Sequence, residues 1–147
     1  MECNSAAVAS EDNRELSLKG FNGSLTLRRT CVGDSLPDLI DFKIEVEAQD
    51  FRGNAYLEVL DTQFVGFARE LEKRFAQLRG FAILESLNGN EIRIDFDKMG
   101  HVEVSGRIRN VGEDATCLQF SFGTDQTYIG PLIIQLRELI SASGAHG

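Results

Sequence analysis

The feature that most constrains the fold is a strict alternation of side-chain type in residues 91–96 and again in residues 101–108. In both runs the even positions are apolar or glycine and the odd positions are polar, which is the period of a strand with one buried and one exposed face. Gly100 lies just before the second run and can adopt the positive φ that a three-residue hairpin loop requires. The two runs therefore predict an antiparallel hairpin with its loop at residues 98–100. The predicted register pairs Phe96 with Val102 and Asp97 with His101.

Residues 61–79 follow a different period. Their apolar side chains recur every three or four positions, with charged residues on the opposite side, as in an amphipathic helix that covers a sheet. Asp61 or Thr62 is expected to cap the first amides of this helix. Gly80 is expected to provide the left-handed stop at its end.

Shorter alternating segments predict further strands, and Arg52-Gly53-Asn54 is expected to reverse the chain between two of them. A closing amphipathic helix is predicted over residues 129–140. Proline fits only near a helix start, so either this helix begins near Gly130 or Pro131 makes its first turn irregular. These further strands are expected at residues 15–19, 24–31, 42–48, 55–59, 81–87 and 118–122. The predicted fold class is α+β, a largely antiparallel sheet of about 7–8 strands with two amphipathic helices packed on one face.

The chain length indicates one domain with one core, because 147 residues is an ordinary size for a single domain. We expect a disordered leader at residues 1–13, a single α+β domain at 14–140 and a flexible tail at 141–147. No apolar run approaches the ~18 to 20 residues of a membrane helix, and the amino terminus is a poor secretory signal, so a cytoplasmic location is expected. The odd number of cysteines fits reduced thiols, with a bridge between Cys31 and Cys117 as the alternative.

The charge distribution argues against direct nucleic-acid binding and indicates an acidic surface. The formal net charge is -8, and the segment from Asp34 to Asp61 holds eight acidic residues against two basic ones, so a phosphate backbone would be repelled. Carboxylates at exposed strand positions, with a tyrosine beside them, are suited to a basic protein partner. A solvated sheet face without a partner is the alternative. The residues predicted to contact a partner are Glu45, Glu47, Asp50, Tyr56 and Glu58.

Asp97 and His101 are the residues best placed for chemistry. A carboxylate beside an imidazole is the arrangement of a general base, and Asp95 and Glu103 share the same predicted face. An exposed hairpin tip explains the same residues without chemistry, because the sequence places no nucleophile or second histidine beside them. A small hydrolase or metal-dependent enzyme that uses Asp97 and His101 is therefore the alternative function.

The common nucleotide and nucleophile motifs are absent: neither GxGxxG, GxxxxGK[ST], GxSxG nor CxxC occurs. The sequence therefore assigns no catalytic residue, cofactor or metal ligand. The stretch Asp125-Gln126-Thr127-Tyr128 has the look of a motif, but a helix cap accounts for it.

Several stretches between about residue 50 and residue 140 resemble the WapI-type immunity proteins and related bacterial domains of unknown function. The most recognisable are the Gly-His-Val and Asp-Gln-Thr-Tyr stretches, neither of which is a catalytic signature. The amino-terminal third resembles no family that we can name. The matching stretches are Phe64-x-x-Phe67 to Leu71, Leu84-Glu-Ser-Leu-Asn-Gly89, Ile92-x-Ile94, Gly100-His101-Val102-x-Val104, Phe120-x-Phe122-x-x-Asp-Gln-Thr-Tyr128 and Leu132-Ile-x-Gln-Leu136.

The resemblance implies a cytoplasmic, non-enzymatic antitoxin that binds the toxic carboxy-terminal domain of a polymorphic toxin and blocks it. Such toxins are often nucleases with basic clefts, which an acidic protein can occlude by charge and shape. The resemblance supplies no toxin-contacting residues, so the acidic surface rests on the charge count alone. A monomer or a homodimer is expected, and a homo-oligomeric scaffold domain is a further alternative.

Overall fold

The computed structural model describes residues 15–30, 38–109 and 116–143, and the structural statements below refer to these residues. They form two four-stranded antiparallel sheets. Sheet A contains β1 (Glu15–Lys19), β2 (Gly23–Arg29), β3 (Leu39–Ala48) and β4 (Phe51–Leu60). Sheet B contains β5 (Gly80–Glu85), β6 (Glu91–Phe96), β7 (His101–Arg109) and β8 (Cys117–Asp125). Helix α1 (Asp61–Gln77) links the sheets, and the 3-10 turn η2 (Gln126–Tyr128) leads into helix α2 (Ile129–Ser143).

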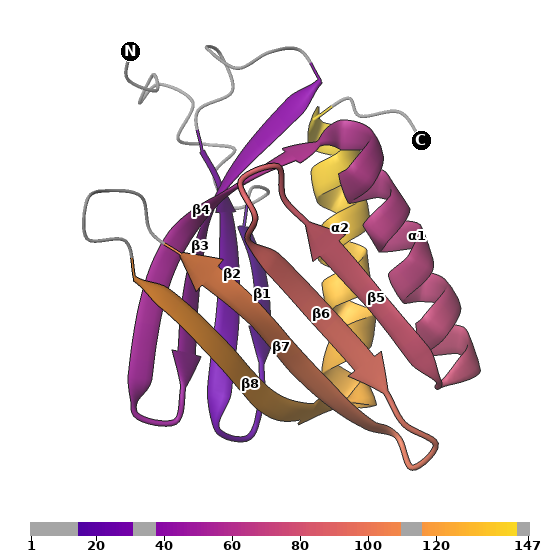
Figure 1. Ribbon diagram of the computed structural model, residues 1–147. Coiled ribbons are helices and arrows are strands. Elements are labelled where there is room, and N and C mark those ends of the chain that lie inside the picture. The colour runs from indigo at the N-terminus through magenta and orange to yellow at the C-terminus, as the bar shows by residue number, and fades with distance from the viewer. Residues whose placement is uncertain (1–14, 31–37, 110–115, 144–147) are drawn as a thin grey trace.

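The inner faces of the two sheets and the apolar faces of both helices enclose one core. Sheet B lies in front of sheet A in Figure 1, and the helices close one side of the molecule. There α1 packs along β5, and α2 packs along β1 and against α1. Phe42 of β3 and Phe64 of α1 are fully buried and pack with their ring centroids 5.2 Å apart. Arg137 of α2 forms two hydrogen bonds with Glu72 of α1, which joins the helices at the surface.

The predicted α+β class is confirmed, with antiparallel strands and two amphipathic helices, and the strands are divided between two sheets. The hairpin register is confirmed as well. Phe96 pairs with Val102, and the Asp97 N–H donates to the His101 carbonyl at 3.0 Å. Gly100 has a φ of +84°, as the three-residue loop requires.

The predicted chain reversal at Arg52-Gly53-Asn54 was wrong. The turn lies at residues 49–50, and Gly53 is inside β4, paired with Val46. The glycine serves packing there, because a Cβ on Gly53 would lie 2.7 Å from Cδ2 of Leu118 in β8. The sequence alone does not distinguish a glycine that allows a neighbouring strand to pack closely from a glycine that forms a turn.

The predicted ends of α1 also differ from the structure. Leu60 is the N-terminal cap residue, and its N–H donates to the Gln63 side chain at 3.0 Å, so neither Asp61 nor Thr62 is the cap. Leu78, with a φ of +52°, is the left-handed residue after the helix. The cap moves because β4 continues to Leu60 without a loop, which leaves no room for a separate polar cap.

Helix α2 begins at Ile129, and its first turn continues η2, in which Asp125 accepts a hydrogen bond from the Thr127 N–H. It continues to Ser143, beyond the expected end at residue 140. No helix in the described ranges is long and apolar enough to cross a membrane. Cys117 is a free, exposed thiol. Cys3 and Cys31, the leader at 1–13, most of the loop at 33–38, the whole turn at 110–115 and the tail residues 144–147 lie outside the described residues.

Asn90 joins the two sheets. It is only 2% exposed, and its side chain donates to the Tyr56 carbonyl of β4 at 2.9 Å. The same side chain accepts from the Arg109 N–H of β7 at 2.9 Å. The Leu87 N–H donates to the Glu58 carbonyl at 2.7 Å, so the β5–β6 turn closes this edge of sheet A.

Candidate functional site

The outer face of sheet A carries four of the five predicted partner-binding residues. Because side chains alternate along a strand, Glu45 and Glu47 of β3 and Tyr56 and Glu58 of β4 all point away from the core. Asp50 lies in the β3–β4 turn at the end of the same face. Glu58 is in register with Asp41 of β3. Asp41 and Glu47 are six residues apart along β3, a span of about 20 Å. The five predicted residues therefore lie on one side of sheet A, along a strip about 20 Å long.

The acidic excess on this face is smaller than the segment count suggests, because β1 and β2 bring basic residues beside it. Arg28 pairs with Glu15 at 3.0 Å, and Arg52 pairs with Glu47 at 2.9 Å. Glu45 lies between Thr26 and Asn54, neither of which is charged. At strand positions the outward acidic residues are Glu15, Asp41, Glu45, Glu47 and Glu58, and the outward basic residues are Lys19, Arg28, Lys43 and Arg52.

A hollow of about 690 Å³ lies at the end of this face where the β1–β2 and β3–β4 turns meet. The Gln49 N–H donates to the Asn22 carbonyl at 2.7 Å, which fixes the two turns against each other. We call residues 20–22 and 49–52 the turn end of sheet A. Polar and charged side chains, with the glycines at 20 and 23, line the hollow: Lys19, Asn22, Ser24, Glu47, Gln49 and Asp50.

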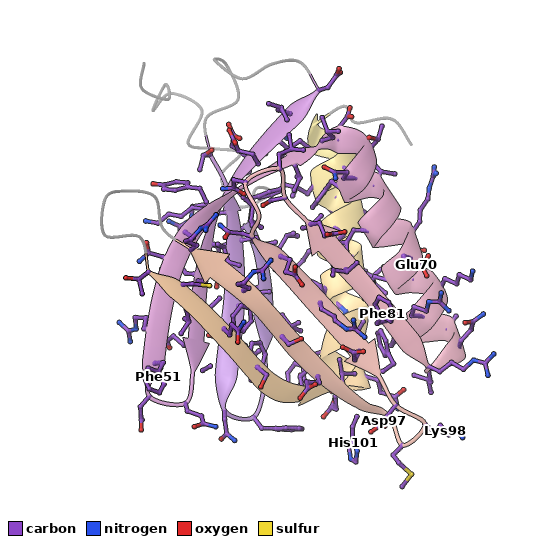
Figure 2. All side chains as sticks on the ribbon, in the orientation of Figure 1. Phe51, Glu70, Phe81, Asp97, Lys98 and His101 are labelled. Carbon is purple, nitrogen blue, oxygen red and sulfur yellow. The ribbon has the colours of Figure 1, made fainter. Side chains whose placement is uncertain are left out.

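Two exposed phenylalanines at the turn end escaped the sequence interpretation. Phe21 is 64% exposed and Phe51 is 67% exposed, the highest values among the aromatic residues of the described ranges. Phe51 is labelled in Figure 2, at the start of β4. Aromatic side chains in such positions often carry the binding energy of protein interfaces. A phenylalanine beside turn residues was the available signal, but the misplaced turn at Arg52 concealed it.

The opposite end of the face is held by the β5–β6 turn. The side chains of Asn88 and Asn90 both donate to the Tyr56 carbonyl, at 2.8 and 2.9 Å. The backbone of β4 is fixed there while the Tyr56 ring stays 53% exposed. Leu87 is exposed in the same turn, so this end presents a tyrosine and a leucine beside Glu58.

Asp97 and His101 lie together at the tip of the β6–β7 hairpin. His101 Nδ1 is 3.4 Å from Asp97 Oδ2, and both side chains are largely exposed, projecting into solvent with Lys98 in Figure 2. Asp97 Oδ1 accepts hydrogen bonds from the N–H groups of Met99 and His101, at 2.8 and 3.1 Å. Desolvation acts to raise the pKa of the Asp97 carboxyl, but those N–H groups and the His101 imidazole lower it below its usual value. The geometry gives Asp97 a structural role as the cap of the hairpin loop.

The candidate enzyme residues do not extend to a metal centre. Asp95 pairs with Glu103, but Asp95 is engaged by Arg93 through two hydrogen bonds of 2.8 and 3.0 Å. Across residues 15–30, 38–109 and 116–143, no three His, Cys, Asp or Glu side chains are grouped to hold a metal ion.

Comparison with known proteins identifies a family. A family model described as "Immunity protein WapI-like family" matches residues 11–143. The match includes β1, β2 and β3, which lie in the amino-terminal third that had suggested no family, as well as the stretches that carry the resemblance. No curated protein matches the chain. Because the match spans both sheets and both helices, the chain belongs to the WapI-like family of immunity proteins.

Proposed function

We propose that this protein is a non-enzymatic immunity protein that binds and neutralises the toxic domain of a bacterial polymorphic toxin in the cytoplasm. The observation that carries the proposal is the family match over residues 11–143. The exposed outer face of sheet A supports it, because neutralisation by binding requires a surface and no reacting groups. The toxin class that this protein suits best is a nuclease, whose basic substrate cleft an acidic protein can cover.

The toxin contacts the outer face of sheet A through Glu45, Glu47, Asp50, Tyr56 and Glu58. Glu45 is the carboxylate most available to a basic partner, since both of its cross-strand neighbours are uncharged. Glu47 is already paired with Arg52 at the surface, an interaction that a toxin arginine or lysine can exchange at small cost. The strip of about 20 Å fits within one side of a standard interface, which buries roughly 800 Å² per partner.

Co-expression with the toxin domain encoded by the neighbouring gene tests the function. Growth is restored if the chain neutralises the toxin, and the purified pair elutes as one complex. If the chain neither rescues growth nor binds that domain, the proposed function is wrong. The masses of the free chain and of the complex also separate an immunity protein from a homo-oligomeric scaffold.

Charge reversal tests the surface. Changing both Glu45 and Glu47 to lysine should lower the affinity for the toxin domain at least tenfold, on the order of the penalty for like charges across an interface. The melting temperature should change little, because both side chains are exposed. The matched control changes Glu85 and Glu103 to lysine. Both are exposed on the outer face of sheet B, and the net charge changes by the same amount. Equal effects of the two double variants would assign the loss to net charge and remove this face from the proposal.

A further inference from the structure

The four edges of the two sheets differ in what lies beside them. The β5–β6 turn closes part of the β4 edge, and the β1 edge meets α2, where the Gln135 side chain accepts from the Ser17 N–H at 2.9 Å. Helix α1 packs along the β5 edge. The β8 edge has no such cover in the described part of the chain, where no helix or strand runs along the side of β8 away from β7 (Figure 1).

The register shows which backbone groups of β8 face outward. The Arg109 N–H and the His101 carbonyl of β7 bond to Asn90 and Asp97 on the β6 side, so the odd residues of β7 face β6. The even residues of β7 then bond to the even residues of β8. Gln119 and Ser121 therefore direct their N–H and carbonyl groups away from sheet B. The outward direction of the odd residues is seen directly at Gly123, whose carbonyl accepts from the Phe21 N–H at 2.8 Å.

The sequence of β8 does not protect this edge. Free edges usually carry lysine, proline or a bulge, which prevent another strand from pairing with them. Residues 117–124 contain no charged residue and no proline. Cys117, Gln119 and Ser121 are exposed on the outer face of β8. An exposed, uncharged edge of this kind is a template for one more strand.

Both exposed phenylalanines of the turn end flank the β8 edge. Phe122 of β8 packs over Gly23 of β2, and Leu118 packs over Gly53 of β4, so β8 crosses the inner face of sheet A at this end. Phe51 of β4 is in register with Ala48 of β3, which is in register with Gly23 of β2. Phe51 is two residues from Gly53, so it is on the strand face that points towards the core, yet it is 67% exposed. It therefore lies where β8 leaves the inner face of sheet A uncovered. At the other end of the edge, Phe21 lies beside Gly123, with a ring carbon 3.5 Å from where a Cβ on Gly123 would be.

We propose that an extended segment of the toxic domain adds to sheet B as a fifth strand along β8. Its backbone pairs with the outward groups of Gln119 and Ser121, and its inward side chains cover Phe51 and Phe21. Asp50 precedes Phe51 and lines the hollow on the outer face of sheet A, so a basic residue at the end of the segment reaches the proposed acidic surface. This inference rests on the proposed function. It specifies that the toxic domain contacts the outer face of sheet A and also extends past the turn end to the β8 edge.

A second copy of this chain fits the edge less well. The turn end of sheet A projects past β8, and its Phe51 occupies the layer beneath any added strand. A single strand can lie over this projection. A second copy paired edge to edge would bring its own turn end into the same layer, and the two would overlap.

Amide hydrogen exchange of the full chain, alone and bound to the toxin domain encoded by the neighbouring gene, tests the proposal. The Gln119 and Ser121 amides should exchange at least tenfold more slowly in the complex, because they gain partners only there. The Ile83 amide on the β5 edge is the matched control and should not change. If a complex forms and the Gln119 and Ser121 amides exchange as in the free chain, the strand addition is wrong while the proposed function stands.

Two substitutions provide an independent readout. Gln119→Pro removes an outward N–H that the described fold does not use, and Phe51→Ser removes the flanking ring. Each should lower the toxin affinity at least tenfold, whereas Ile134→Ser, at a similarly exposed apolar residue of α2 outside both proposed contact surfaces, should not. Should Gln119→Pro fail to fold, Phe51→Ser decides, and unchanged affinity of this variant overturns the proposal. Protection of Gln119 and Ser121 in the free chain, together with a dimer mass, would also overturn it, in favour of a second copy.

Discussion

Replacing Asn90 with alanine tests the joint between the two sheets. Asn90 lies in the β5–β6 turn, yet its side chain contacts β4 of one sheet and β7 of the other. Truncation removes the donor to the Tyr56 carbonyl and the acceptor of the Arg109 N–H, each at 2.9 Å. The Tyr56 carbonyl keeps a hydrogen bond from the Asn88 side chain, whereas the Arg109 N–H loses the Asn90 side chain as its acceptor.

The expected destabilisation follows from these bonds. Each lost hydrogen bond contributes about 1 kcal/mol, and the Arg109 N–H left without its partner adds about 1 kcal/mol or more. The total is about 3 kcal/mol, which lowers the melting temperature by roughly 10 °C for a domain of this size. Asn88→Ala removes one donor from the same carbonyl at an exposed position and should cost about 1 kcal/mol or less.

Urea unfolding of the wild type, Asn90→Ala and Asn88→Ala measures both effects. A lower midpoint at an unchanged slope assigns the loss to the folded state. If Asn90→Ala is no less stable than Asn88→Ala, the Asn90 side chain does not stabilise the joint between the sheets and the reasoning is refuted.

Three further changes have defined outcomes. Gly66→Ala should raise the free energy of unfolding by up to about 1 kcal/mol in a thermal melt, because Gly66 is inside α1 and no heavy atom lies within 4 Å of the added Cβ; a lower melting temperature would contradict the open site. The pKa of Asp97 is lowered in the fold, so its carboxylate stabilises the hairpin above the ordinary carboxyl pKa, and this stability is lost as pH falls through the lowered value. The difference in melting temperature between wild type and Asp97→Asn should therefore shrink on acidification below about pH 4, and a constant difference would exclude the charge effect. Glu72→Gln should cost less than about 1 kcal/mol, and the cost should fall at high salt, since the Arg137 pair is at the surface.

Local pattern was sufficient for much of the fold. The alternation in residues 91–108 gave the hairpin, its register and its glycine loop, because these depend on contacts between residues close in the chain. The pattern failed at Gly53 and at the cap of α1. Both failures arise from contacts with distant residues: Leu118 requires the glycine, and the direct passage of β4 into α1 makes Leu60 the cap.

The candidate site shows the same limit. Strand parity was enough to put Glu45, Glu47, Tyr56 and Glu58 on one face, as the structure has them. Parity could not show that Arg28 and Lys19 share that face, because this depends on how β1 and β2 pair with β3. Nor could parity reveal that Phe51 is exposed, because Phe51 is apolar and lies on the same side of β4 as the buried residues of the core.

The sequence by itself determined the strand and helix periods, the hairpin at residues 91–108 and the membership of an immunity family, because each depends on the order of residues along the chain. The tertiary structure decided which strand edges are covered, how the charges of sheet A balance, and where two phenylalanines meet the open edge of β8. These properties arise when strands distant in sequence pack together, and the period of any single strand does not contain them.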